Sequence, residues 1–196
     1  MTLYSNVLFV HIASTLALFL GYGLEWTVSS LLPHASTTEQ ARAWLRVYRV
    51  SPPVTGVALA VLILSGGWLS AMTGGMNQGW LIASVAGIVV ALVIGFALIL
   101  PRVRRIRAAL PEGNAALSPE ALVQLQSEAL PTLIQARALL AVVIVYLMTA
   151  KPPLGVSLRF LAVPIVVLPL GSALRWLRRG WEERHGFART RKGPQA

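Results

Sequence analysis

The chain has 196 residues, of which 56% are hydrophobic and only 12% are charged, and its mean hydropathy is +0.68. A soluble domain carries about 25% charged residues, so this composition excludes an ordinary water-soluble protein and indicates lipid as the main solvent. The absence of cysteine excludes disulfides, thiolate metal sites and cysteine nucleophiles. The net charge of +10 does not indicate nucleic-acid binding, because the basic residues flank apolar segments and form no basic domain.

Five apolar segments predict an all-α, polytopic membrane protein. Each has about 20 residues or more, the length that crosses about 30 Å of hydrocarbon at 1.5 Å per residue. Because lipid offers the backbone no hydrogen-bonding partner, each segment is expected to be a helix. We expect one five-helix transmembrane domain over residues 1–180 and a flexible cytoplasmic tail at 181–196. The predicted spans are 5–31, 53–73, 79–101, 131–150 and 155–176.

Prolines mark several boundaries of these segments. Pro33 follows the first span, Pro101 is expected to end the third, and Pro131 precedes the fourth. Between the third and fourth spans, Ser118 followed by Pro119 has the pattern of a helix N-cap with proline at the first helical position. A short helix is therefore predicted before the fourth span.

The orientation follows from the distribution of Lys and Arg. Most of the 17 basic residues lie in the loops 33–52 and 102–130 and in the C-terminal region, which share one side of the membrane if five spans alternate. Cytoplasmic loops are enriched in Lys and Arg, so we predict an outside N-terminus and a cytoplasmic C-terminus, in a bacterial inner membrane. The loop residues are Arg42, Arg46, Arg49, Arg102, Arg104, Arg105 and Arg107.

Polar residues of the first span fall on one stripe. At 100° per residue, His11, Thr15, Tyr22 and Glu25 lie within about 40° of one helix direction. A charge facing lipid near the bilayer centre costs about 2.5–3.5 kcal/mol or more, so the stripe is predicted to face the bundle interior. Arg137 lies near the inner end of the fourth span, as Glu25 does in the first, and the two are candidates for an interior ion pair.

His11 has two main interpretations: an interior histidine bonded to a neighbouring helix, or the ligand of a cofactor or small molecule. Met148 and Lys151, near the outer end of the fourth span, lie at a similar depth and are candidate partners. One histidine is too few for a zinc or copper site built on imidazole, whereas haem needs only one strong axial ligand. We therefore predict no metal-ion site and assign no catalytic residue.

Three stretches carry a resemblance to known proteins: LYSNVLFVHIASTLALFLGYGLEW, PPVTGVALAVLILSGGWLSAM and RALLAVVIVYLMTAKP. They resemble a family of predicted bacterial integral membrane proteins, a domain of unknown function. The helix layout is also similar to the copper-resistance D proteins and to the membrane-type protoporphyrinogen oxidase, in which a first-span histidine and a lysine are linked to b-type haem and to catalysis. His11 matches that histidine by position, whereas Lys151 stands in a different setting, beside two prolines.

Three functions are compatible with these observations. The preferred one is a membrane protein whose interior polar site binds a small ligand, b-type haem through His11 being one candidate. The second is a small permease or exporter whose polar stripe lines a path. The third is a structural or assembly subunit, as a homo-oligomer or within a larger membrane complex. Whether the protein is an enzyme stays open.

Overall fold

The computed structural model describes residues 2–74, 77–111 and 116–166, which form helices joined by short connections, with no strand in these ranges. The elements run in chain order as follows: α1 (Leu3–Leu31), the 3-10 turn η1 (Leu32–His34), α2 (Thr38–Tyr48), α3 (Ser51–Met72), α4 (Gly79–Val93), the π-helical segment η2 (Ile94–Ile99), α5 (Leu100–Ala109), α6 (Pro119–Leu125) and α7 (Ala129–Ala150). A last described helix covers Leu154–Val166.

Among the described residues, four helical segments are long and apolar enough to cross a membrane: Leu3–His34, Thr38–Met72, Gly79–Ala109 and Pro119–Ala150. They cover the first four predicted spans to within one residue and confirm the all-helical, multi-span expectation. The helix Leu154–Val166 is shorter, and the rest of the predicted fifth span, like the predicted tail, lies outside the described residues. The fifth span and the orientation of the termini therefore stay predictions.

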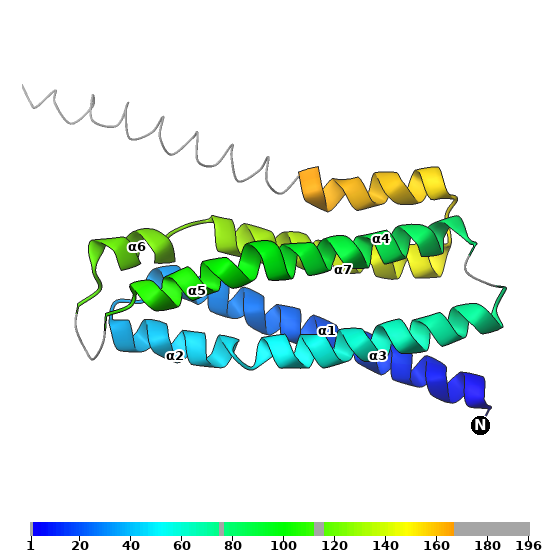
Figure 1. Ribbon diagram of the computed structural model, residues 1–196, viewed down its shortest axis with the longest axis horizontal. Helices are drawn as coiled ribbons and strands as arrows, with labels where there is room; N and C mark the ends of the chain where they lie inside the picture. The colour runs from blue at the N-terminus through cyan, green and yellow to red at the C-terminus, as the bar shows by residue number, and fades with distance from the viewer. Residues whose placement is uncertain (1, 75–76, 112–115, 167–196) are drawn as a thin grey trace, which may run out of the picture.

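The long helices lie side by side along one axis (Figure 1). α1 packs on α3, α4 packs on α7, and α1 also contacts α7, which joins the two pairs into one bundle. The helix Leu154–Val166 lies along the outside of the bundle and contributes Leu161 to the core beside α4 and α7. A central cluster around Leu18, Tyr22 and Leu62 contains Ala141 of α7, so three helices meet where the polar stripe of α1 lies.

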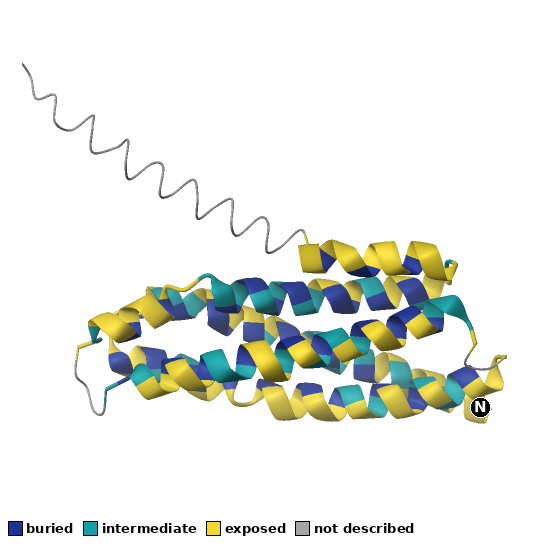
Figure 2. Cartoon of the chain, turned by 45° about the horizontal axis from the view of Figure 1, so that its top comes forward, coloured by how far each residue is buried: buried dark blue, intermediate teal, exposed yellow. Residues whose placement is uncertain are grey.

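The outer surface of the bundle is apolar along most of its length. Phe9, Leu20 and Leu64 are 71%, 75% and 74% exposed, and exposed residues cover the outward faces of every long helix (Figure 2). Exposed apolar area on this scale is incompatible with water in a monomer. The exposed side chains are therefore the lipid-facing surface.

The sequence predicts that the third span ends at Pro101. In the structure the helix continues through η2 and α5 to Ala109, so this prediction is wrong. Proline has no N–H and its ring clashes with the preceding turn of an α-helix. The turn before Pro101 widens into the π-helical segment η2, in which the N–H of Leu100 donates to the carbonyl of Gly95. The Arg102 guanidinium donates to the carbonyl of Leu98 at 2.8 Å. The helix therefore accommodates the proline without breaking.

The region 33–52, expected as a loop, contains the amphipathic helix α2. Thr37 caps it by accepting a hydrogen bond from the backbone N–H of Gln40 at 3.2 Å, and the Gln40 side chain accepts one from the N–H of Ser36 at 2.9 Å. This reciprocal pattern is close to a capping box. The short helix predicted at Ser118 is confirmed as α6, where Ser118 accepts from the N–H of Ala121 at 3.1 Å.

Candidate functional site

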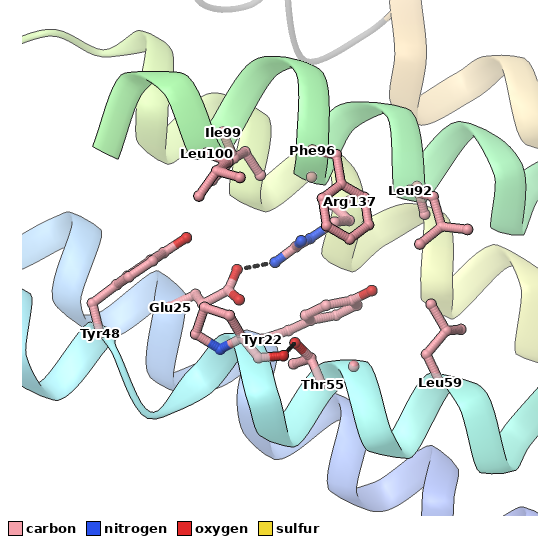
Figure 3. A pocket seen from close by; sticks show the side chains of 14 residues that line it. Tyr22, Glu25, Tyr48, Thr55, Leu59, Leu92, Phe96, Ile99, Leu100 and Arg137 are labelled. Atoms are coloured by element: carbon pink, nitrogen blue, oxygen red, sulfur yellow. Dashed lines mark hydrogen bonds and ion pairs between the residues drawn. The ribbon is translucent and has the colours of Figure 1, made fainter. Parts of the chain in front are cut away.

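Glu25 of α1 and Arg137 of α7 form an ion pair inside the bundle (Figure 3). Their side chains are only 2% and 11% exposed. The two residues are far apart in the sequence but lie at the same depth, because α1 and α7 pack directly on one another. Burying a charge is costly unless a partner of opposite sign is present, so each residue of the pair makes the burial of the other possible.

Three neighbours support this pair. The hydroxyl of Ser51, at the start of α3, lies 2.8 Å from Oε1 of Glu25 and 2.9 Å from the carbonyl of Gly21, and it donates its proton to these acceptors. The Tyr22 ring lies under the guanidinium of Arg137, with 4.5 Å between Cζ and the ring centroid. A Cβ at Gly95 would come within 2.9 Å of Nη1 of Arg137, so any larger residue at this position would displace the guanidinium.

A cavity of about 190 Å³ adjoins the pair. It lies between the α1–α3 pair and the α4–α7 pair, and Figure 3 shows the ring of Tyr48 and the side chain of Phe96 on its walls. Gly56 lines it as well, and both Gly56 and Phe96 are exposed. The cavity therefore reaches the lipid-facing surface between α3 and η2. The remaining lining residues are mostly apolar: Pro52, Thr55, Leu59, Ala91, Leu92, Ile99 and Leu100, besides Tyr22, Glu25, Gly95 and Arg137.

The Arg137 side chain has one donor left over. Its Nε is buried and has no hydrogen-bonding partner among the described residues. A buried donor without an acceptor costs about 1–3 kcal/mol, and the guanidinium, which stays protonated in proteins, has only donors to offer a partner. The site thus combines one unused hydrogen-bond donor with an apolar cavity beside it.

His11 lies about four helical turns along α1 from Glu25, in a second and much smaller cavity of about 40 Å³. Ser65 of α3 donates its proton to the carbonyl of Val61 at 2.6 Å, so its Oγ accepts the Nδ1–H of His11 at 3.0 Å. Met148 lines the same cavity, but Lys151 does not. Lys151 is exposed, and its Nζ lies 5.5 Å from the centroid of the Trp80 ring.

Thr15 lines the His11 cavity, and its hydroxyl donates to the backbone carbonyl of His11 at 2.9 Å. Tyr22 and Glu25 are buried, whereas His11 and Thr15 are half-buried. The polar stripe thus faces α3 and α7, divided between two cavities that share Tyr22 as a wall.

Haem, which the resemblance to protoporphyrinogen oxidase implies, does not fit at His11. The hydrogen bond to Ser65 leaves Nε2 as a potential ligand atom, but about 40 Å³ holds only a few water molecules. A Cβ at Gly66 would already lie 3.0 Å from Cε1 of His11, so α1 and α3 are in close contact here. The described residues also hold no group of three or more His, Asp or Glu side chains placed to bind a metal ion.

Ser51, Gly95 and Tyr48 belong to the site although they were not predicted as site residues. Ser51 reads as a residue that opens a helix, and Tyr48 lies in a region taken as a loop. The signal for α2, the segment Thr37 to Gln40, is present in the sequence. Nothing in the sequence indicates the position of Gly95, because its role depends on the π-helical segment.

A family model described as "Predicted integral membrane protein (DUF2269)" matches residues 5–152, from the first turn of α1 to the end of α7. The match includes every residue of both cavities and confirms the resemblance to a family of integral membrane proteins. No curated protein and no solved structure matches the chain.

Proposed function

Since the chain belongs to the DUF2269 family of predicted integral membrane proteins, we propose that it binds a small lipid-soluble molecule within the membrane, in the cavity beside Glu25 and Arg137. The proposal rests on two observations about Arg137: its Nε is buried without a hydrogen-bonding partner among the described residues, and the residue lines this cavity. An acceptor atom on a ligand would remove the cost of the unused donor.

The size and the lining of the cavity indicate the class of ligand. An apolar cavity of about 150 Å³ in another protein binds benzene, so about 190 Å³ accommodates a single ring with one small substituent. The walls are mostly apolar, and the ring of Tyr48 and the side chain of Phe96 suit an aromatic or quinonoid ring. We therefore expect a single-ring compound that carries one hydrogen-bond acceptor, such as a carbonyl oxygen.

The route of access follows from the exposed residues at the rim. Gly56 and Phe96 are exposed on the lipid-facing surface, and both line the cavity. A lipid-soluble compound already concentrated in the bilayer would reach the site sideways, between α3 and η2. The protein would then sense, carry or shelter its ligand without exposing it to water.

Fluorine NMR on the protein in nanodiscs tests this proposal with two probes of similar size. Para-fluoroacetophenone carries a carbonyl acceptor, and para-fluoroethylbenzene carries none. We expect a protein-bound signal for both and about tenfold or greater preference for the ketone, since a hydrogen bond to a charged donor contributes about 1.5–3 kcal/mol.

Two glycines of α3 provide matched variants. A Cβ at Gly56 and a Cβ at Gly67 would each meet no atom within 4 Å, but only Gly56 lines the cavity. Gly56→Phe places a ring at the mouth of the cavity and should abolish the bound signal, whereas Gly67→Phe should leave it unchanged. Equal binding by both variants, or no bound signal for either probe, would contradict the proposal.

A small permease is the second candidate. The observation that favours it is that the two cavities share the lining residues Tyr22, Leu59 and Ala91, so polar groups follow one another from His11 to Glu25. Proteoliposomes loaded with a pH-sensitive dye would test proton passage along this line. The permease predicts faster dissipation of a pH gradient than in protein-free vesicles and slower dissipation for Leu59→Trp, which would fill the shared wall; equal rates in all three would exclude it.

A further inference from the structure

A groove separate from the interior site lies between α2 and α5. These two helices lie at the end of the bundle away from the N-terminus (Figure 1). Its volume is about 760 Å³. Four arginines and one acid line it, with two leucines: Glu39, Arg42, Leu45, Arg46, Arg49, Arg107 and Leu110. We propose that this groove binds the phosphate group of an anionic phospholipid.

The groove is built by the amphipathic pattern of α2. Arg42, Arg46 and Arg49 follow one another at helical spacing on one face, while the neighbouring face of α2 is buried against the bundle. Arg107 of α5 faces them across the groove. Like charges at this spacing repel one another, so an arrangement of four arginines around one hollow favours an anion between them.

Two of the arginines are held in place by backbone carbonyls. The Arg42 guanidinium donates to the carbonyl of Pro111, and Nη2 of Arg107 donates to the carbonyl of Leu45 at 3.3 Å. These bonds cross between α2 and the end of α5 and fix the width of the groove. Each guanidinium has five N–H donors, so both retain donors for a phosphate oxygen.

The depth of the groove favours a lipid over a soluble anion. Arg49 stands just before α3, where the lipid-facing surface begins. The third long helix, Gly79–Ala109, has 31 residues and exceeds the length needed for about 30 Å of hydrocarbon, so Arg107 lies at the level of the headgroups. Leu45 and Leu110 supply an apolar floor for the glycerol and upper acyl chains. Basic pockets of this kind beside membrane helices suit anionic headgroups.

Dansyl-labelled phosphatidylglycerol, titrated into the full-length protein in detergent, tests the proposal by energy transfer from tryptophan. Trp44 belongs to α2, the helix that forms one wall of the groove, and provides a donor within energy-transfer range. Arg46→Gln with Arg49→Gln should weaken binding about 25-fold, because each arginine near an anionic headgroup contributes about fivefold. The matched control is Arg104→Gln with Arg105→Gln, which removes the same charge from exposed positions of α5 outside the groove.

A variant that is expected to strengthen lipid binding distinguishes a loss of binding from a loss of folding, because misfolding would only weaken it. Glu39 is the one acid among the described lining residues, and Glu39→Gln should strengthen binding about fivefold. Equal weakening by the two arginine pairs would indicate diffuse surface charge and overturn the proposal. Binding of dansyl-labelled phosphatidylcholine with the same affinity would overturn it too. So would displacement of the labelled lipid by millimolar inorganic phosphate, because the groove would then be a site for soluble anions.

Discussion

The guanidinium of Arg137 lies 4.5 Å from the centroid of the Tyr22 ring, while its far end pairs with Glu25, one helical turn along α1 from that ring. α1 therefore offers Arg137 both an anion and the negative face of an aromatic ring. Both contacts come from a single helix, so the position of α7 relative to α1 decides whether either forms. The pair thereby links the two halves of the bundle at the wall of the cavity.

Replacing one member of the Glu25–Arg137 ion pair should destabilise the protein more than replacing both members. Glu25→Gln or Arg137→Met alone leaves a buried charge without its partner, which costs about 3–5 kcal/mol. The double variant removes both charges and should recover most of that loss. Unfolding of the four proteins in a mixed-detergent titration gives the coupling energy. Two single variants whose effects simply add up in the double variant would show that the pair is not coupled.

Ser51 should contribute measurably through its hydrogen bond to Glu25. The side chain is fully buried, and its hydroxyl bonds a charged acceptor, so Ser51→Ala should cost about 1.5–3 kcal/mol. The control is Ser30→Ala, at an exposed position near the end of α1 that carries Glu25. It should change the free energy of unfolding by less than about 0.5 kcal/mol. Melting temperatures in one detergent compare them, and equal shifts would show that the Ser51 hydroxyl is dispensable.

Gly21 should be required where α1 meets α3, and Gly23 should not. A Cβ at Gly21 would overlap the Cγ2 methyl of Thr55, whereas a Cβ at Gly23 meets no atom within 4 Å. Gly21→Ala should therefore destabilise the bundle by about 1–3 kcal/mol through overpacking, and Gly23→Ala by far less. Thr55→Ser removes the obstructing methyl and should rescue Gly21→Ala. Without rescue, the steric explanation would be wrong.

Haem should not bind at His11. The protein, purified after expression with added haem, is expected to show no Soret band, because the cavity around His11 measures only about 40 Å³. His11→Ala serves as the matched sample for any background absorbance. A Soret band that is present in the wild type and lost in His11→Ala would refute this prediction and return His11 to the status of a haem ligand.

Much of the fold could be predicted from the composition of a few segments. Four of the predicted spans match the four long apolar helices of the described residues to within one residue at the ends they overrun, because the length of a span is set by the thickness of the hydrocarbon core and its helical form by the lack of water. The third span continues past its predicted end because the π-helical segment η2 accommodates Pro101 without a break in the helix. The helix α2 was not predicted because its many polar residues are typical of a loop, although the sequence contains the residues that cap it.

Composition and helical periodicity alone predict that the protein is embedded in lipid and that the polar side of α1 faces the bundle interior, because an unpaired charge is too costly at the lipid-facing surface. The similar depths of Glu25 and Arg137 made these two residues candidates for an ion pair, but the packing of the helices determines the other contacts of the polar side chains. Glu25 pairs with Arg137 while Lys151 points to Trp80, and the larger cavity adjoins the ion pair and not His11. Hydrophobicity acts on each segment alone, whereas a cavity depends on how side chains from several helices fill the space between them.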